Sequence, residues 1–171
     1  RAGAKGVERF MKRYYLVAKE VGDLTRIFCA QLEEQHKRKK FFRLPRLGQR
    51  RRLEDGFVIG GGRIDVEHAK VFAEDPVRLL RLFHLVQQRQ VDIHPRALKL
   101  ITRNLSLIDN ALRHDPEANR LFLEILCSRH DPEIALRRLN EAGILGRFVP
   151  DFGRVVAQMQ HDMYHVYTVD E

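Results

Sequence analysis

The sequence predicts a mostly α-helical bundle with one long N-terminal helix, several short helices opened by Asp-Pro pairs and a small β-hairpin. Three observations lead to this fold class. The 171-residue chain is 44% hydrophobic and 32% charged, with no Trp and only 11 Gly, a composition more typical of a soluble helical protein than of a sandwich. Its first segment shows sustained helical periodicity, and proline pairs divide most of the remainder into short helical units.

The first segment, from about Val7 to Gln35, predicts one long amphipathic helix. Gly22 is its weak point, because glycine lowers helix stability. The apolar positions recur three or four residues apart, at Phe10, Met11, Tyr14, Val17, Ala18, Val21, Leu24, Phe28 and Leu32.

A basic stretch follows, which accounts for the excess positive charge of the chain. The stretch "HKRKKFFRLPRLGQRRR", from His36 to Arg52, holds nine Lys or Arg and no acid. We interpret it as a solvated connector, with contact to phosphate or to an acidic partner as the alternative. Next, "FVI" and "RIDV" are short β runs joined by three glycines that permit positive φ, which predicts a hairpin rather than a phosphate-binding loop.

Four proline pairs predict where the later helices begin. In this pattern the Asp side chain accepts amide hydrogens of the first turn, and Pro at the first helical position loses nothing, since its missing N–H would be unpaired there. Gly143 supplies a C-terminal stop for the last of these helices. The pairs are Asp75-Pro76, His94-Pro95, Asp115-Pro116 and Asp131-Pro132.

His-Asp dipeptides raise the question of metal binding. In the first two, the carboxylates of Asp115 and Asp131 are expected to cap helices, which leaves His114 and His130 facing solvent. The third lies in a helical pattern that places His161 and His165 four residues apart on one face, so these two are weak candidates for a divalent ion. The cysteines, Cys29 and Cys127, are expected to be buried free thiols.

Other catalytic signatures are missing from the sequence. It has no Asp-x-Asp pair for metal-assisted nucleotidyl transfer, no GxSxG, no Walker loop and no HExxH, so no catalytic residue is expected in this chain. No apolar run approaches 18 residues and no signal peptide is evident, which indicates a cytoplasmic protein without a membrane partner.

Three stretches closely resemble the bifunctional uridylyltransferases and uridylyl-removing enzymes that modify the nitrogen-signalling PII protein. They begin at "GVERFMKRYY", at "EDPVRLLRLFHL" and at "DPEANRLFLEIL", and the last continues to "MYHVYTVDE". The resemblance implies an interior segment of a larger enzyme that uses UTP and Mg²⁺ on PII and responds to glutamine. It places a nucleotidyltransferase domain before this segment, and an HD-type metal hydrolase domain and two ACT domains after it.

The resemblance also implies a division of the chain. Residues 1–36 would be the long helix after the nucleotidyltransferase domain, 37–71 the basic connector and hairpin, and 72–160 a helical linker domain. Residues 161–171 would begin the hydrolase domain. The segment itself is expected to bind no cofactor and to be catalytically inert.

One short motif could contact the nucleotide. "EDPVR", Glu74 to Arg78, is similar to the ED-x-x-R pattern of tRNA CCA-adding enzymes and bacterial poly(A) polymerases, where the Asp and Arg face the base. By that resemblance, Asp75, Arg78 and, one turn further, Arg81 would line a UTP pocket. The alternative is that Asp75 only caps a helix and Arg78 is a solvated charge.

Two other functions remain open at the level of sequence. The chain could be the body domain of a tRNA-processing nucleotidyltransferase, with the basic stretch as an RNA track, although no stacking face or recognition helix supports nucleic-acid binding. It could also be a non-catalytic helical interaction module that docks PII.

Overall fold

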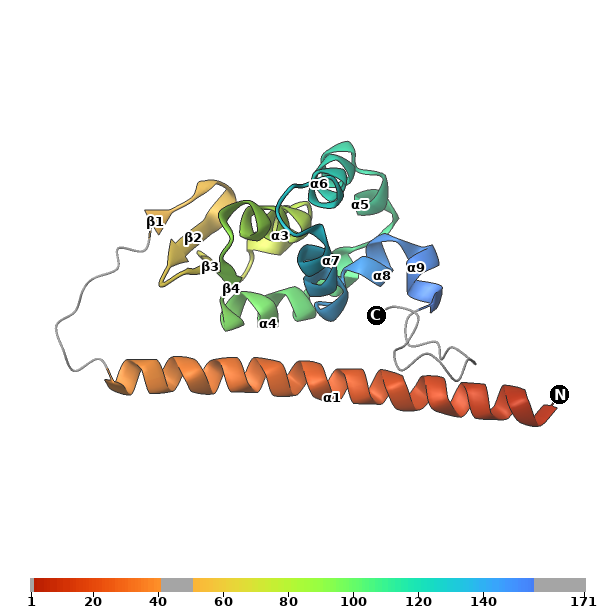
Figure 1. Ribbon diagram of the computed structural model, residues 1–171. Helices are drawn as coiled ribbons and strands as arrows, with labels where there is room; N and C mark the ends of the chain where they lie inside the picture. Colours follow the sequence, from red (N-terminus) through yellow and green to blue (C-terminus); the bar gives the residue numbers. More distant parts are fainter. Residues whose placement is uncertain (1, 41–50, 156–171) are drawn as a thin grey trace.

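Helices dominate the computed structural model, which describes residues 2–40 and 51–155 (Figure 1). The prediction of a mostly α-helical fold with a small β element is confirmed. The helices are α1 (Ala2–Lys40), α2 (Val71–Glu74), α3 (Arg78–Arg89), α4 (Pro95–Arg103), α5 (Asn110–His114), α6 (Pro116–Leu126), α7 (Pro132–Glu141), α8 (Leu145–Phe148) and α9 (Pro150–Val155). The strands are β1 (Arg51–Arg52), β2 (Phe57–Gly60), β3 (Arg63–Val66) and β4 (Asp92–Ile93), and short 3₁₀ turns are η1 (Glu54–Gly56) and η2 (Leu105–Leu107).

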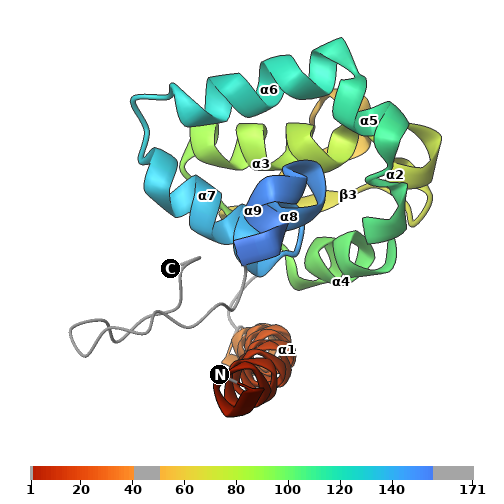
Figure 2. The same ribbon diagram turned by 90° about the vertical axis from the view of Figure 1, so that its right-hand side faces the viewer.

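The long N-terminal helix is longer than the sequence indicates. Helix α1 continues through Gly22 and ends at Lys40, so the first residues of the basic stretch belong to the helix. It lies along one side of the remaining elements, where it contacts α4 (Figures 1 and 2). The Lys12 ammonium donates to the backbone oxygen of Arg154 at 3.4 Å, which links α1 to α9.

The predicted hairpin is confirmed and belongs to a larger sheet. Strands β2 and β3 pair antiparallel, with Ile59 opposite Ile64, and the turn between them holds Gly61 and Gly62 at φ of 61° and 76°. Glycine adopts these left-handed angles without the steric penalty of a Cβ. The sheet order is β1-β2-β3-β4, and β4 pairs parallel to β3. The outer strands have two residues each, too few to show a periodic pattern.

Two of the predicted helix openings have the expected geometry. The Asp115 carboxylate accepts from the Ala118 amide at 2.8 Å, and Pro116 is the first residue of α6. At α4, the His94 ring accepts from the Arg96 amide at 3.1 Å. The cap prediction for Asp115 is therefore confirmed.

The cap prediction for Asp131 is wrong. Asp131 precedes α7 but has φ of 38° and ψ of 66°, and its side chain accepts no hydrogen bond from the first turn. An N-cap residue needs extended backbone angles to direct its carboxylate at the helix amides, and the left-handed conformation does not provide them. The predicted burial of the two cysteines is also wrong, because Cys29 and Cys127 are free thiols but both are exposed.

The predicted end of α7 is confirmed. Gly143 has φ of 76°; its amide donates to the Asn140 oxygen, and the Ile144 amide donates to the Leu139 oxygen. These two bonds form a Schellman motif. Leu139 and Ile144, the apolar residues that accompany such a motif, are both fully buried.

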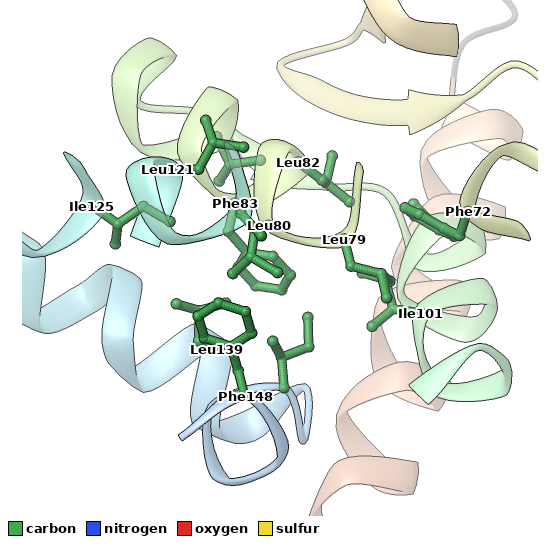
Figure 3. Packing of buried hydrophobic residues seen from close by; sticks show 14 of the residues in the cluster. Phe72, Leu79, Leu80, Leu82, Phe83, Ile101, Leu121, Ile125, Leu139 and Phe148 are labelled. Atoms are coloured by element: carbon green, nitrogen blue, oxygen red, sulfur yellow. The ribbon is translucent and has the colours of Figure 1, made fainter. Parts of the chain in front are cut away.

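The core is built around α3, which Figure 2 shows between α6 and α4, while α4 packs against β3. Helix α3 packs against α6 and α7, and its buried side chains meet those of the surrounding elements in one continuous cluster (Figure 3). The central residues of this cluster are Phe72, Leu79, Leu80, Leu82, Phe83, Ile101, Leu121, Ile125, Leu139 and Phe148.

Some sequence predictions lie outside the described residues. These are most of the basic stretch, the metal candidates His161 and His165, and the start of a hydrolase domain at 161–171. Within residues 2–40 and 51–155, no helix is long and apolar enough to cross a membrane.

Candidate functional site

The Glu74–Arg78 motif lies at the junction of α2 and α3, beside the turn η1. Asp75 separates the two helices in an extended conformation, with φ of −149° and ψ of 101°. One carboxylate oxygen, Oδ1, accepts from the Val77 amide at 3.0 Å. Asp75 thus satisfies an amide at the entrance to α3, as the capping interpretation expects, and its other oxygen faces two arginines.

Arg78 is folded back onto α2. Its Nη1 donates to the Val71 backbone oxygen at 3.0 Å and to Glu74 Oε2 at 3.3 Å. Its Nε lies 3.7 Å from Asp75 Oδ2. The Arg78 side chain is 19% exposed, so it is not the solvated helix charge of the alternative interpretation. It links the first turn of α3 to α2.

Arg81 is the centre of an ionic network that joins three parts of the fold. Its Nη1 lies 3.2 Å from Asp55 Oδ1 in η1 and 3.5 Å from Asp75 Oδ2. Its Nη2 lies 3.3 Å from Glu117 Oε1 in α6. One guanidinium therefore binds carboxylates that lie before α2, between α2 and α3, and at the start of α6.

The network continues along α6. Arg120 donates to Glu117 at 2.8 Å and 2.7 Å and also pairs with Glu124. These hydrogen bonds lower the pKa of the Glu117 carboxyl to about 2 and raise the pKa of Arg120. His84 of α3 reaches Glu124 Oε2 at 3.1 Å. Burial lowers the pKa of His84, and the negative charge of Glu124 opposes this effect only in part.

A groove of about 740 Å³ lies beside this network, between the β1–η1 segment and helices α3 and α6. Arg81 lines the groove, whereas Asp75 and Arg78 do not. Several lining residues carried no functional signal in the sequence. They include Asp55, His84, Glu117, Arg120 and Glu124.

The sequence contains only part of the information needed to find this network. Glu117, Arg120 and Glu124 are three or four residues apart on one helix, so their ion pairs could have been predicted from spacing. Asp55 has no such relation to Arg81, and only the tertiary fold brings them together.

A second pocket, of about 440 Å³, lies between α3, β4 and the start of α7. His130 and Asp131 line it, together with Arg138. Arg138 is held by Asp92 at 2.7 Å and by the Val91 oxygen at 3.2 Å. His130 is exposed, with Nδ1 3.4 Å from Gln90 Nε2. The second His-Asp dipeptide therefore lies in a surface pocket rather than in a cluster of metal ligands.

The described residues bring no three His, Cys, Asp or Glu side chains into an arrangement that could hold a metal ion. His114 is exposed, and its Nδ1 lies 2.7 Å from the Asn110 oxygen of its own helix. The carboxylates that converge near η1 surround a cation already, the guanidinium of Arg81.

Comparison with known proteins assigns the chain to a family. Residues 57–148 match the model of the uridylyltransferase GlnD third domain. The chain belongs to this family. It is similar to the bifunctional uridylyltransferase/uridylyl-removing enzyme of Azospirillum brasilense, with 64% identity over 99% of the chain, and to that of Rhodospirillum rubrum, with 54% identity over 100%.

The GlnD third-domain match includes the strands β2 to β4, most of the core and the ionic network apart from Asp55, whereas α1 lies outside it. The chain spans 18% of the length of each of these two relatives. No solved structure matched the chain.

Proposed function

We propose that this chain is the helical segment between the two catalytic domains of a bifunctional uridylyltransferase/uridylyl-removing enzyme, and that it acts as the scaffold between them. The family and the two relatives named above support this parent enzyme. The observation that carries the scaffold role is the network of Arg81, because it locks η1, the α2–α3 junction and α6 into one unit.

The whole enzyme would work in the cytoplasm. It would transfer UMP from UTP to a tyrosine of the PII protein, and would hydrolyse UMP from PII when glutamine is abundant. Mg²⁺ would serve the transfer reaction. The described residues do not fit that ion, since the carboxylates nearest each other are occupied by Arg81 and Arg120. We therefore assign Mg²⁺ to another part of the parent, and this segment positions rather than catalyses.

A second candidate function is contact with the UTP base. It rests on the position of Arg81 at the edge of the groove, where a hydrogen-bonding guanidinium could reach a ligand. Against it, Asp75 Oδ1 accepts from the Val77 amide, Arg78 Nη1 donates to α2, and neither residue lines the groove. If the groove receives uracil, Arg81 is the residue of the three that would read it.

Kinetics of the full-length enzyme distinguish the two functions. For a scaffold, Arg81→Ala and Arg78→Ala should lower the unfolding temperature and reduce transfer and hydrolysis together, with the preference for UTP over CTP unchanged. For base reading, Arg81→Ala should raise the KM for UTP and weaken discrimination against CTP, while hydrolysis is spared. Asp75→Asn retains capping ability but weakens the ion pair with Arg81, so it should then alter base preference through Arg81.

Arg137→Ala is a matched control, because Arg137 pairs with Glu133 on the exposed face of α7, away from the network. It should leave stability and both activities nearly unchanged. A change in base selectivity in an Arg81 variant of normal stability would refute the pure scaffold role.

A further inference from the structure

Helix α1 carries an apolar stripe that the described fold does not cover. Seven large side chains on it are between 52% and 68% exposed. The intervals between successive members alternate between three and four residues, from Val7 to Phe28. The seven residues are Val7, Phe10, Tyr14, Val17, Val21, Leu24 and Phe28.

The rest of the fold contacts a different side of α1. Lys12 reaches α9, and Met11, Lys12 and Tyr15 are the half-buried residues of this region. At about 100° per residue, Lys12 and Tyr15 lie roughly 140–160° around the helix from Val17. The stripe thus points away from the side of α1 that meets the body. Figure 2 shows α1 lying beside that body.

An apolar surface of this length on a soluble helix marks a contact site. The alternating spacing is that of a helix buried along one seam. The next row around the helix, which includes Ala18, Thr25 and Leu32, is uncharged as well. This row makes the apolar face wider than the two rows of residues that a coiled coil buries. Such a width is typical of helices that pack against the core of a globular domain.

This pattern argues against a second copy of α1 as the occupant. Two-stranded coiled coils select their partner through charge pairs that flank the seam. In a parallel pair of copies, Arg13 would face Ala18 and Glu20 would face Thr25, so neither charge would find an opposite one. Self-pairing would leave the seam without these selective contacts.

The comparisons indicate where the occupant lies. The third-domain match begins at residue 57, after α1, and the similar relatives are more than five times as long as this chain. Helix α1 therefore stands between the third domain and whatever precedes it in the parent polypeptide.

We propose that the stripe of α1 packs against an apolar surface of the domain that precedes the third domain in the same polypeptide. Helix α1 would then be a shared strut, attached to its own domain through the side of Lys12 and Tyr15 and to the preceding domain through the side of Val17. The inference rests on the proposed multi-domain parent, but not on its activity.

Thiol labelling of the full-length protein tests this placement. Val17→Cys lies in the stripe, whereas Leu16→Cys is a matched control about 100° around the helix. Cleavage by trypsin after Arg13 and Lys19 puts both positions in the same peptide, residues 14–19, apart from Cys29. The native protein is treated with N-ethylmaleimide for increasing times, and that peptide is quantified by mass spectrometry. Labelling in urea, where both sites are open, gives the reference rate for each variant.

If the preceding domain covers the stripe, Val17→Cys should react at least about tenfold more slowly than Leu16→Cys. In the structure Val17 is the more exposed of the two, at 52% against 39%. Equal rates, or faster labelling at Val17, would therefore overturn the proposal. Protection that disappears on dilution would overturn it too, because it would identify a second copy as the occupant.

The labelling result is independent of the proposed function. Protection of Val17→Cys in a full-length protein that fails to uridylylate PII would refute the activity alone. An active enzyme with an unprotected Val17→Cys would refute the packing of α1 alone.

Discussion

The same four residues, His-Asp-Pro-Glu, begin two helices with different local geometry. Asp115 is extended and its carboxylate caps α6, whereas Asp131 is left-handed and caps nothing. Both are followed by Pro, so the difference comes from the preceding chain. Asp115 directly follows α5, while Asp131 follows a turn in which the Ser128 hydroxyl accepts from the His130 amide. The tetrapeptide specifies a helix start, but the chain that precedes it decides whether the Asp side chain caps the helix.

Asp115→Ala should lower the free energy of unfolding by about 0.5–2 kcal/mol, because it removes the acceptor of the Ala118 amide. Urea denaturation of the chain measures the change. In the full-length enzyme the variant should retain its hydrolase activity, since the carboxylate caps a helix. A normally folded variant without that activity would show that Asp115 has a catalytic role.

Asp131→Gly is the contrasting substitution. Glycine adopts φ of 38° more readily than aspartate, and no capping bond is lost. The free energy of unfolding should stay unchanged or rise by up to about 1 kcal/mol. The same urea titration provides the comparison, and a loss as large as that of Asp115→Ala would contradict the left-handed, uncapped geometry.

His84 should make stability depend on pH. Burial lowers its pKa in the folded chain, so the unfolded chain binds a proton more readily. Its contribution is then fully present above about pH 6.5, the ordinary histidine value, and is lost as the pH falls below it. Urea unfolding at pH 7.5 and 5.5 should show a smaller difference for His84→Gln than for the unchanged chain. Equal pH dependence would rule out this role.

At the scale of elements, two glycines allow close packing in the C-terminal part of the fold, because a side chain at either position would meet neighbouring atoms. A Cβ at Gly143 would lie 3.2 Å from Leu105 Cδ1 and 3.1 Å from Arg147 Nη1. At Gly153 it would lie within 2.3 Å of the Gly146 backbone oxygen, so α8 and α9 can meet only without a side chain there. Gly143 is needed for its positive φ as well as for packing, and Gly153 is needed for packing.

Gly143→Ala should therefore destabilise the fold by about 1–2 kcal/mol from the left-handed angle alone, and by more from the contact with Leu105. Gly61→Ala is the matched control, because its φ is also positive but nothing lies within 4 Å of the new methyl group. Thermal unfolding of both variants measures the difference. Equal losses of stability in the two variants would mean that Leu105 moves aside at little cost.

The sequence predicts those elements whose cause is local. The β2–β3 hairpin follows from its glycines, and α6 from its Asp-Pro opening. Strands β1 and β4 could not be predicted, because a two-residue strand is too short to show alternation of apolar and polar residues. They are strands only because they pair with β2 and β3. Likewise, Asp75, Arg78 and Arg81 could be selected by resemblance, but Asp55 joins them only through the tertiary fold.

At the scale of the whole molecule, we expect the isolated chain to be catalytically inert. Among residues 2–40 and 51–155, no group of His, Cys, Asp or Glu side chains could hold a metal ion that would stabilise the charge developing during phosphoryl transfer. Incubation of the purified chain with UTP, Mg²⁺ and PII should yield no uridylylated PII, as mass spectrometry would show. With modified PII and Mn²⁺ it should release no UMP. Turnover by the pure chain in either assay would refute the scaffold role.

The parallel pairing of β3 with β4 constrains the order in which the chain can fold. Arg63 pairs with Asp92 and Ile64 with Ile93, so this ladder must wait until α2 and α3 have brought the later strand back. Such non-local pairing is slow, because the closing of the intervening loop costs entropy before any contact compensates it. Substitutions in the buried face of α3 should then slow refolding, whereas those in β4 should act mainly by accelerating unfolding.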